Sequence, residues 1–152
     1  MSAMVGFAKA MELACKEMPT ESQRLAALRD RLERGIRERI EFVRTNGSAM
    51  SRLPNVLNVS FEFVEGESLL LGLDMKGVAV STGSACTSGS LEPSHVLRAM
   101  GVPPATAHGS LRFSLGRTTT ERDVDYVLDV LRGIVERLRQ ISPLYTEVTV
   151  SR

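Results

Sequence analysis

The stretch that decides the fold of this chain is Leu-Asn-Val-Ser-Phe-Glu-Phe at residues 57–63. Apolar and polar side chains alternate along it, with the apolar ones expected to face one way, which is the pattern of a half-buried strand. Leu-Arg-Phe-Ser-Leu at residues 111–115 repeats this alternation. The apolar run Val78–Val80 indicates a further, short and buried strand. The sequence therefore predicts a small sheet.

Helical patterns surround these strands. Residues 3–17 predict a helix that Pro19 ends, with Cys15 packed in the core, and Thr20 is expected to cap a second helix reaching about Val43. Shorter helices are expected over 67–75, closed by Gly77, and over 93–100, stopped by Gly101. A last helix begins after a Thr120 cap, and its expected apolar face is Val124, Val127, Leu128, Leu131, Ile134, Val135, Leu138 and Ile141.

This order of elements predicts an α+β, or layered α/β, fold in which a short sheet is covered by helices. The turn-rich stretch 47–54 divides a helical segment, residues 1–50, from a compact body, residues 51–152. Both parts are expected to belong to one structural unit.

Composition excludes several classes of function. The chain has 152 residues, a net charge of +1 and 43% hydrophobic residues, so we expect neither nucleic acid nor an anionic membrane as a partner. No apolar run approaches the roughly 20 residues that span a bilayer. Two cysteines make no disulfide framework, and the N-terminus lacks a secretion signal, so a reducing, cytoplasmic location is expected.

Cys86 is the first candidate for chemistry. It lies in Ser-Thr-Gly-Ser-Ala-Cys-Thr-Ser-Gly-Ser-Leu-Glu-Pro at residues 81–93, without a large apolar neighbour within four residues. A structural cysteine is normally surrounded by apolar side chains, so this thiol is expected on a mobile loop, where it can serve as a nucleophile or sulfur acceptor. An inert loop cysteine is the alternative reading.

Arg112 is the second candidate, because the strand 111–115 holds it on the face opposite Leu111 and Phe113. A guanidinium fixed in this way suits bidentate capture of a carboxylate, although a structural ion pair is an equally common role. Arg117, after Gly116, is interpreted as a turn residue. His95 and His108 lack the ligand spacing of a zinc site, and no metal is expected.

Four stretches together resemble the C-terminal part of a cysteine desulfurase of the NifS/IscS type. They are LPNVLNVSF at 53–61, VEGESLL at 64–70, STGSACTSGSLEPSHVLRAMG at 81–101 and LRFSLGR at 111–117. The resemblance implies the small domain of a fold-type I enzyme dependent on pyridoxal 5′-phosphate (PLP). It implies that Cys86 accepts the sulfur of L-cysteine as a persulfide, and that Arg112 binds the α-carboxylate of the substrate.

The resemblance also implies what this chain does not supply. In that family PLP is bound by a lysine in a Ser-x-His-Lys motif of a large domain, and here lysine occurs only at positions 9, 16 and 76, outside any such motif. We therefore expect PLP in the parent enzyme and none bound by this chain alone. Expected partners are the large domain, a sulfur acceptor or iron–sulfur scaffold protein, and a second subunit, since family members are homodimers.

Three functions follow from these features. The chain is the small domain of a cysteine desulfurase, active only together with the PLP-binding domain; or it is a non-catalytic sulfur carrier that holds a persulfide on Cys86; or it is a folded fragment without activity of its own. The parent activity would serve iron–sulfur cluster and thio-cofactor biosynthesis.

Overall fold

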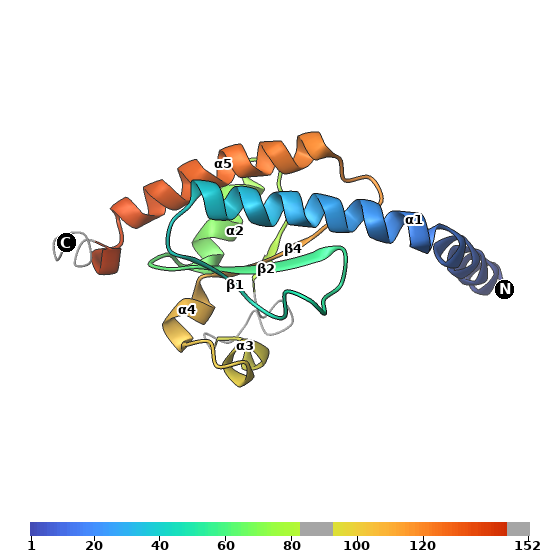
Figure 1. Ribbon diagram of the computed structural model, residues 1–152, viewed down its shortest axis with the longest axis horizontal. Helices are drawn as coiled ribbons and strands as arrows, with labels where there is room; N and C mark the ends of the chain where they lie inside the picture. The colour runs from blue at the N-terminus through green and yellow to red at the C-terminus, as the bar shows by residue number, and fades with distance from the viewer. Residues whose placement is uncertain (83–92, 146–152) are drawn as a thin grey trace.

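A computed structural model describes residues 1–82 and 93–145. Its strands form one small sheet, and its helices lie on both sides of that sheet (Figure 1). The long helix α1 (Ser2–Arg39) and the helix α5 (Glu121–Gln140) lie side by side, and α2 (Gly66–Asp74) packs against α5. The short helices α3 (His95–Ala99) and α4 (Pro104–His108) lie on the other side of the sheet. This arrangement confirms the predicted α+β class.

The sheet has four antiparallel strands in the order β1-β2-β4-β3. They are β1 (Val43–Thr45), β2 (Val56–Phe61), β3 (Ser81–Thr82) and β4 (Ser110–Ser114). The two strands predicted from alternation, β2 and β4, pair at the centre, with Leu57 opposite Phe113 and Val59 opposite Leu111. Because directly opposite residues share a face of a sheet, these apolar side chains all point toward the helices.

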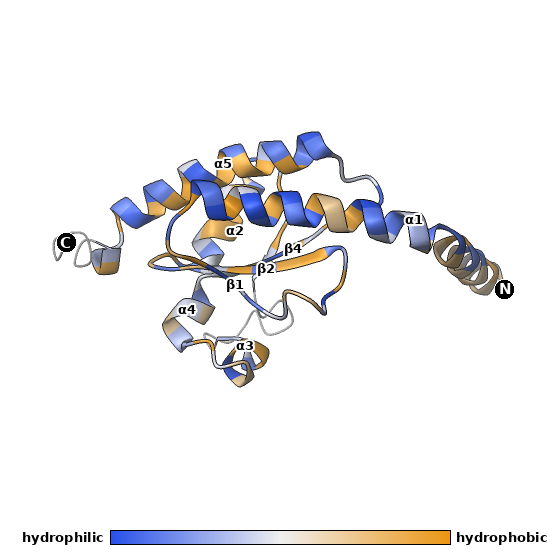
Figure 2. Ribbon diagram, in the orientation of Figure 1, coloured by the Kyte–Doolittle hydropathy of each residue, from blue (hydrophilic) through white to orange (hydrophobic). Residues whose placement is uncertain are grey.

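One hydrophobic core fills the space between the sheet and the helices α1, α2 and α5. Ile36, Phe61, Leu69, Leu111 and Leu131 are each fully buried in it. Figure 2 shows that α5 turns its apolar side toward the sheet and α2 and its polar side outward. Thr120 caps α5 as predicted, accepting from the Asp123 N–H while the Asp123 carboxylate accepts from the Thr120 N–H.

The prediction of two helices divided at Pro19 is wrong, because α1 runs without a break from Ser2 to Arg39. The loop after β4 holds the helix on both sides of the proline. Arg117 pairs with Glu17 at 3.0 Å, and Arg24 donates to the carbonyl oxygens of Arg117 and Thr119 at 2.9 and 2.6 Å. Thr20 is accordingly a mid-helix residue and not a cap.

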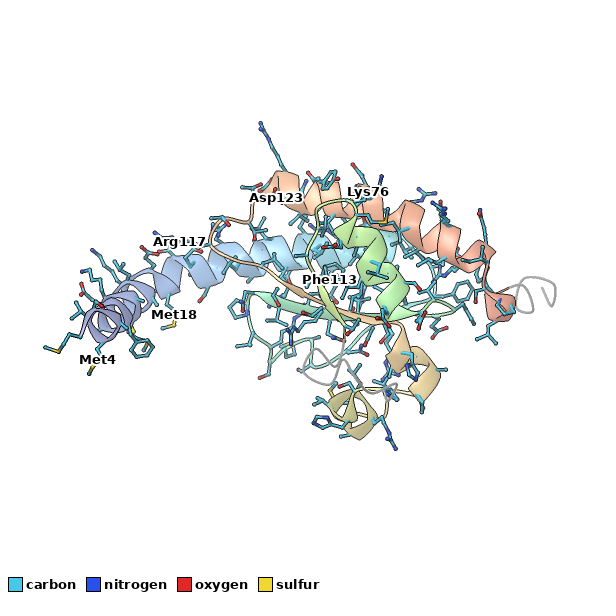
Figure 3. The ribbon with its side chains drawn as sticks, turned by 180° about the vertical axis from the view of Figure 1, so that it is seen from behind. Met4, Met18, Lys76, Phe113, Arg117 and Asp123 are labelled. Carbon is cyan, nitrogen blue, oxygen red and sulfur yellow. The ribbon has the colours of Figure 1, made fainter. Side chains whose placement is uncertain are left out.

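The prediction that Cys15 packs in the core is also wrong, since this residue is exposed. The first part of α1 extends past the sheet, and Met4 and Met18 project from it in Figure 3. Residues 2–16 are all exposed, and Met4, Phe7 and Met11 are each more than half exposed.

Four other local predictions differ from the structure. The helix expected to reach about Val43 ends at Arg39, and residues 43–45 form β1. Residues 78–80 form no strand; the Val78 N–H instead donates to the Leu73 carbonyl, which ends α2, and β3 begins at Ser81. Phe63 leaves the core face of β2 because its φ is +65°, and its ring packs edge-on against Phe42, with centroids 5.5 Å apart. Ile141 follows the end of α5 and is 76% exposed.

Along the described ranges 1–82 and 93–145, the helices are all too short or too polar to cross a bilayer.

Candidate functional site

We call the face of the sheet that points away from α1, α2 and α5 the open face. It carries a row of polar side chains that crosses the strands. Arg112 lies in the middle, directly opposite Asn58 on one side and Ser81 on the other. Asn46, at the end of β1, donates its backbone N–H to the Asn58 carbonyl at 2.9 Å and so extends the row. We call these four residues the polar row.

Arg112 is held by its neighbours in the strand. Leu111 and Phe113 are buried against the helices, so the arginine between them faces the other way and is exposed. Its guanidinium donates to the Ser81 hydroxyl at 3.4 Å, a long hydrogen bond. Within residues 1–82 and 93–145 it makes no ion pair, whereas Arg31 and Arg52 each contact carboxylates. The alternative role of Arg112, a structural ion pair, is therefore not found in the described part of the chain.

The asparagines of the polar row are joined to each other. The Asn46 amide nitrogen donates to the Asn58 side-chain oxygen at 2.7 Å and to the Ser60 hydroxyl at 2.8 Å. Ser60 is fully buried, which anchors this pair of hydrogen bonds at the base of the open face. Neither asparagine is predicted as a site residue from the sequence, because Asn58 occupies a polar position of the alternating pattern and Asn46 lies outside the predicted strands.

Cys86 lies outside the described residues, so its position and surroundings are not part of the site as built here. In the sequence, Cys86 follows Ser81, the cross-strand partner of Arg112, by five residues.

The two histidines do not join this row. His95 is the first residue of α3, and His108, the last residue of α4, lines a cavity of about 700 Å³ with Glu62, Glu65 and Ser68. In the part of the chain that the structure describes, no group of three or more acidic, histidine or cysteine side chains could hold a metal ion.

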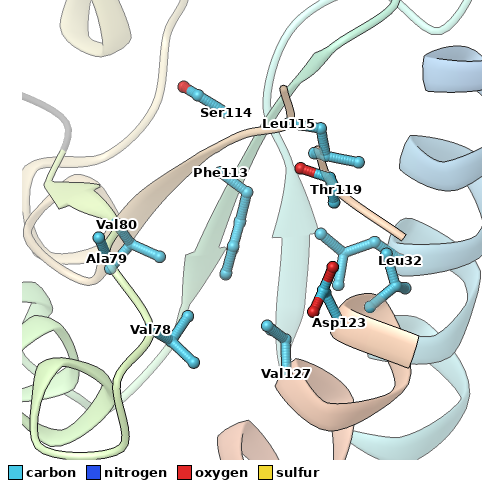
Figure 4. A pocket seen from close by; sticks show the side chains of 11 residues that line it. Leu32, Val78, Ala79, Val80, Phe113, Ser114, Leu115, Thr119, Asp123 and Val127 are labelled. Atoms are coloured by element: carbon cyan, nitrogen blue, oxygen red, sulfur yellow. The ribbon is translucent and has the colours of Figure 1, made fainter. Parts of the chain in front are cut away.

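A second cavity, of about 150 Å³, lies between the core helices and residues 78–80 (Figure 4). Its walls are mainly apolar, with Leu32, Val78 and Phe113 facing it, while Ser114 is directed away. Of its polar lining groups, Asp123 and Thr119 are occupied by hydrogen bonds to Thr120 and Gly116. Neither cavity contains Arg112, so both are separate from the polar row.

The described residues do not fit PLP. The cofactor would need a lysine beside the substrate site, and each of the three lysines of the chain is exposed elsewhere: Lys9 and Lys16 on α1, and Lys76 after α2. Lys9 is paired with Glu12 at 2.8 Å, and neither cavity is lined by a lysine. We derive no chemical step through the cofactor from this chain.

Comparison with known proteins agrees with the fold. The sequence profile of the aminotransferase class-V family matches residues 1–127, and the chain belongs to this family. It is 54% identical over 149 residues to the cysteine desulfurase IscS of Dictyoglomus turgidum, covering 98% of this chain and 38% of that protein. It is also 54% identical over 142 residues to a cysteine desulfurase of Gluconacetobacter diazotrophicus, covering 93% of this chain and 36% of that protein.

A solved structure of a NifS-like protein matches with a TM-score of 0.77 and 34% identity, over 88% of this chain and 33% of the other. The resemblance predicted from the four sequence stretches is thereby confirmed. The chain spans little more than a third of the length of these relatives.

Proposed function

We propose that this chain supplies the sulfur-accepting thiol and the substrate carboxylate site of a cysteine desulfurase. In this proposal Arg112 binds the α-carboxylate of L-cysteine, and Cys86 accepts its sulfur. The carbon–sulfur bond of cysteine breaks, a sulfur–sulfur bond forms on Cys86, and the products are alanine and the Cys86 persulfide. Residues 51–152 act as the small domain, and residues 1–50 lead into it.

The proposal rests on the exposure of the Arg112 guanidinium and on how few hydrogen bonds it makes. Its guanidinium is exposed on a rigid central strand, and its single hydrogen bond within the described residues, to Ser81, is 3.4 Å long. Arginine has five N–H donors, so most of them are left for a ligand. A planar cation fixed between two buried neighbours suits bidentate binding of a carboxylate.

The chain length between Arg112 and Cys86 fits the same reaction. Cys86 is four residues from Thr82, so their Cα atoms can be at most about 14 Å apart, and we propose that this short connection lets the thiol reach a substrate held at Arg112. Loops held by a rigid scaffold commonly carry such groups. We propose a further step in which the persulfide passes to an acceptor, such as an iron–sulfur scaffold protein, in the reducing cytoplasm.

The remaining components are proposed to come from a PLP-binding portion corresponding to the part of the relatives that this chain does not match. That portion would bring the cofactor and its lysine, and a second subunit would complete a homodimer. The exposed apolar side chains of the first part of α1, including Met4, Phe7 and Met11, offer a surface for it, because contiguous exposed apolar surface commonly marks an interface.

Reconstitution tests this proposal. The chain is mixed with a separately produced PLP-binding portion of a related cysteine desulfurase, and alanine formation from L-cysteine is measured. We expect activity with the wild-type chain, its loss in Cys86→Ser, and a large rise in KM in Arg112→Lys. Arg137→Lys is the matched control for Arg112→Lys, because Arg137 is exposed on α5, away from the polar row and from α1, and it should leave activity intact.

The same samples separate the alternatives. Absence of alanine under every refolding condition would contradict the enzyme proposal. A Cys86-dependent persulfide label acquired from another desulfurase, without alanine formation, would instead make the chain a sulfur carrier. Retention of full activity in Cys86→Ser would remove this residue from the reaction.

A further inference from the structure

We propose that Asn58 is a second donor of the carboxylate site around Arg112, and that Asn46 is a positioning residue that fixes the orientation of Asn58. The inference rests on the proposed function, in which Arg112 binds the substrate carboxylate. It adds Asn58 to the site as a second binding residue and Asn46 as the residue that holds Asn58 in place.

The register of the sheet places Asn58 beside Arg112. The two are direct cross-strand partners of β2 and β4, and such partners have Cβ atoms about 4.5–5.5 Å apart on one face. The Arg112 guanidinium contacts Ser81 in this structure, and a carboxylate that it binds after turning over β2 would be within reach of the Asn58 amide. Ser81, on the opposite side of Arg112, completes a line of three polar groups.

The hydrogen bonds of Asn46 determine which end of the Asn58 amide remains available. The Asn58 oxygen accepts from the Asn46 amide nitrogen at 2.7 Å, and the backbone bond between the two residues, 2.9 Å, fixes their register. With its oxygen occupied, Asn58 presents its nitrogen, which is a donor only. In the described ranges 1–82 and 93–145, the structure provides no acceptor for this nitrogen.

Arg112, Asn58 and Ser81 thus offer donors to a ligand, while the one acceptor of the polar row without a partner in the part of the chain that the structure describes, the Asn46 side-chain oxygen, is buried. Arg112 contributes a cation, Asn58 an amide N–H, and Ser81 a hydroxyl that already accepts from Arg112 and can donate its own hydrogen. No carboxylate neutralises Arg112 among the described residues. A carboxylate has two oxygens, which can accept from Arg112 and Asn58 at the same time.

Nuclear magnetic resonance of the intact chain tests the inference without the cofactor. L-alanine and, separately, acetate are titrated at constant ionic strength, with sodium chloride as the control for screening. We expect the Arg112 Nε–H signal and the two Asn58 Nδ2–H signals to shift together, with one common dissociation constant. Asn58→Leu should weaken binding at least about tenfold, as expected for the loss of one hydrogen bond to a charged group.

Matched variants complete the test. Asn46→Ala should weaken binding by a smaller factor while the Asn58 signals broaden or divide, because the amide is no longer held in one orientation. Ser114→Ala, two residues along the same face of β4, should change nothing. Backbone spectra report whether each variant is folded, and Asn58→Ala replaces the leucine variant if that one is not.

The outcomes distinguish this inference from the function on which it rests. A shift of Arg112 with Asn58 unmoved, or equal affinity in a folded Asn58 variant, would overturn the role of Asn58 and leave the carboxylate site intact. Absence of any saturable shift at Arg112 would remove the carboxylate site, and the role of Asn58 with it.

Discussion

The backbone of Gly109 lies directly against the backbone of Phe61, whose N–H donates to the Gly109 carbonyl over 2.9 Å. A Cβ atom added to Gly109 would collide with the Phe61 carbonyl oxygen and come within 2.7 Å of that of Val64. Both obstacles are backbone atoms, which cannot rotate away. This contact fixes the start of β4 on β2, and therefore the register that places Arg112 opposite Asn58.

We expect Gly109→Ala to destabilise the chain by about 2 kcal/mol or more, because the backbones must separate, as in an overpacked core. Urea unfolding followed by circular dichroism measures the change. Gly116→Ala is the control, since nothing lies within 4 Å of an added Cβ there, and it should change the free energy of unfolding by less than about 0.5 kcal/mol. Equal stability of the two variants would contradict the close contact.

Arg139, near the end of α5, binds the backbone segments next to β1 and β2. Its side chain is 5% exposed and donates to the carbonyl oxygens of Glu62, Glu41 and Phe42 at 3.2, 2.9 and 3.2 Å. It also lies over the rings of Phe42 and Tyr145, 5.7 and 5.5 Å from their centroids. Burial lowers the pKa of Arg139 from its ordinary value, although the three carbonyl oxygens supply acceptors for the cation.

We expect Arg139→Met to reduce the free energy of unfolding by about 2–4 kcal/mol, since three partly buried carbonyl oxygens lose a charged donor. Arg137→Met, exposed two residues earlier on α5, should have little effect. Thermal unfolding of the two variants provides the comparison. A similar small change in both would mean that the bonds of Arg139 contribute no net stability.

Glu33 makes stability depend on pH. Burial works to raise the pKa of Glu33, but hydrogen bonds from Arg52 and Thr45 and the charges of Arg52 and Arg37 outweigh it, so the pKa lies below its ordinary value. The Arg52 guanidinium is 2.6 Å from the Glu33 carboxylate. Because the folded pKa is below the unfolded one, this stabilisation is complete above the unfolded value of about 4.3 and is lost as pH falls toward the folded pKa.

Glu33→Gln should therefore lower stability by about 1 kcal/mol at pH 7 and flatten the decline in stability below pH ~4.5. Urea unfolding at a series of pH values measures both effects. Glu38→Gln, on the exposed side of the same helix, is the control and should keep the wild-type slope. An unchanged slope in Glu33→Gln would assign the acid sensitivity to other carboxylates, such as Glu21 and Asp123, whose pKa values are also lowered by hydrogen bonds.

Local patterns predicted the parts of the fold that depend on neighbouring residues. The alternation around Asn58 and Arg112 identified two strands and the faces of their side chains, because strand periodicity is local. The Thr120 cap was predictable for the same reason. What the alternation could not supply is the register between β2 and β4, which depends on contacts between residues more than 50 positions apart. The pairing of Asn58 with Arg112 is therefore visible only in the structure.

Departures from the local patterns have distant causes. Phe63 continues the apolar alternation, yet its positive φ turns it toward Phe42 and Tyr145, which the pattern of residues 57–63 does not contain. The continuity of α1 through Pro19 depends on Arg117 and the loop after β4, about 100 residues away. The prediction for Cys86 rests on the sequence alone, because this residue lies outside the described residues.

Pro19 should weaken α1 locally even though the helix continues through it. Proline lacks the N–H that would bond to the carbonyl of Cys15, and in a helix interior it costs about 3 kcal/mol relative to alanine. Residues 2–18 have few other supports, since most of their side chains are exposed, so this segment depends on the backbone bonds of the helix. We expect Pro19→Ala to slow amide hydrogen exchange over residues 5–18 at least about tenfold. Ser22→Ala, three residues further along α1, should leave that exchange nearly unchanged, because Ser22 already has its backbone N–H. Equal protection of residues 5–18 in both variants and in the wild-type chain would show that the loop contacts of Glu17 and Arg24, and not the missing hydrogen bond, govern the stability of the first part of α1.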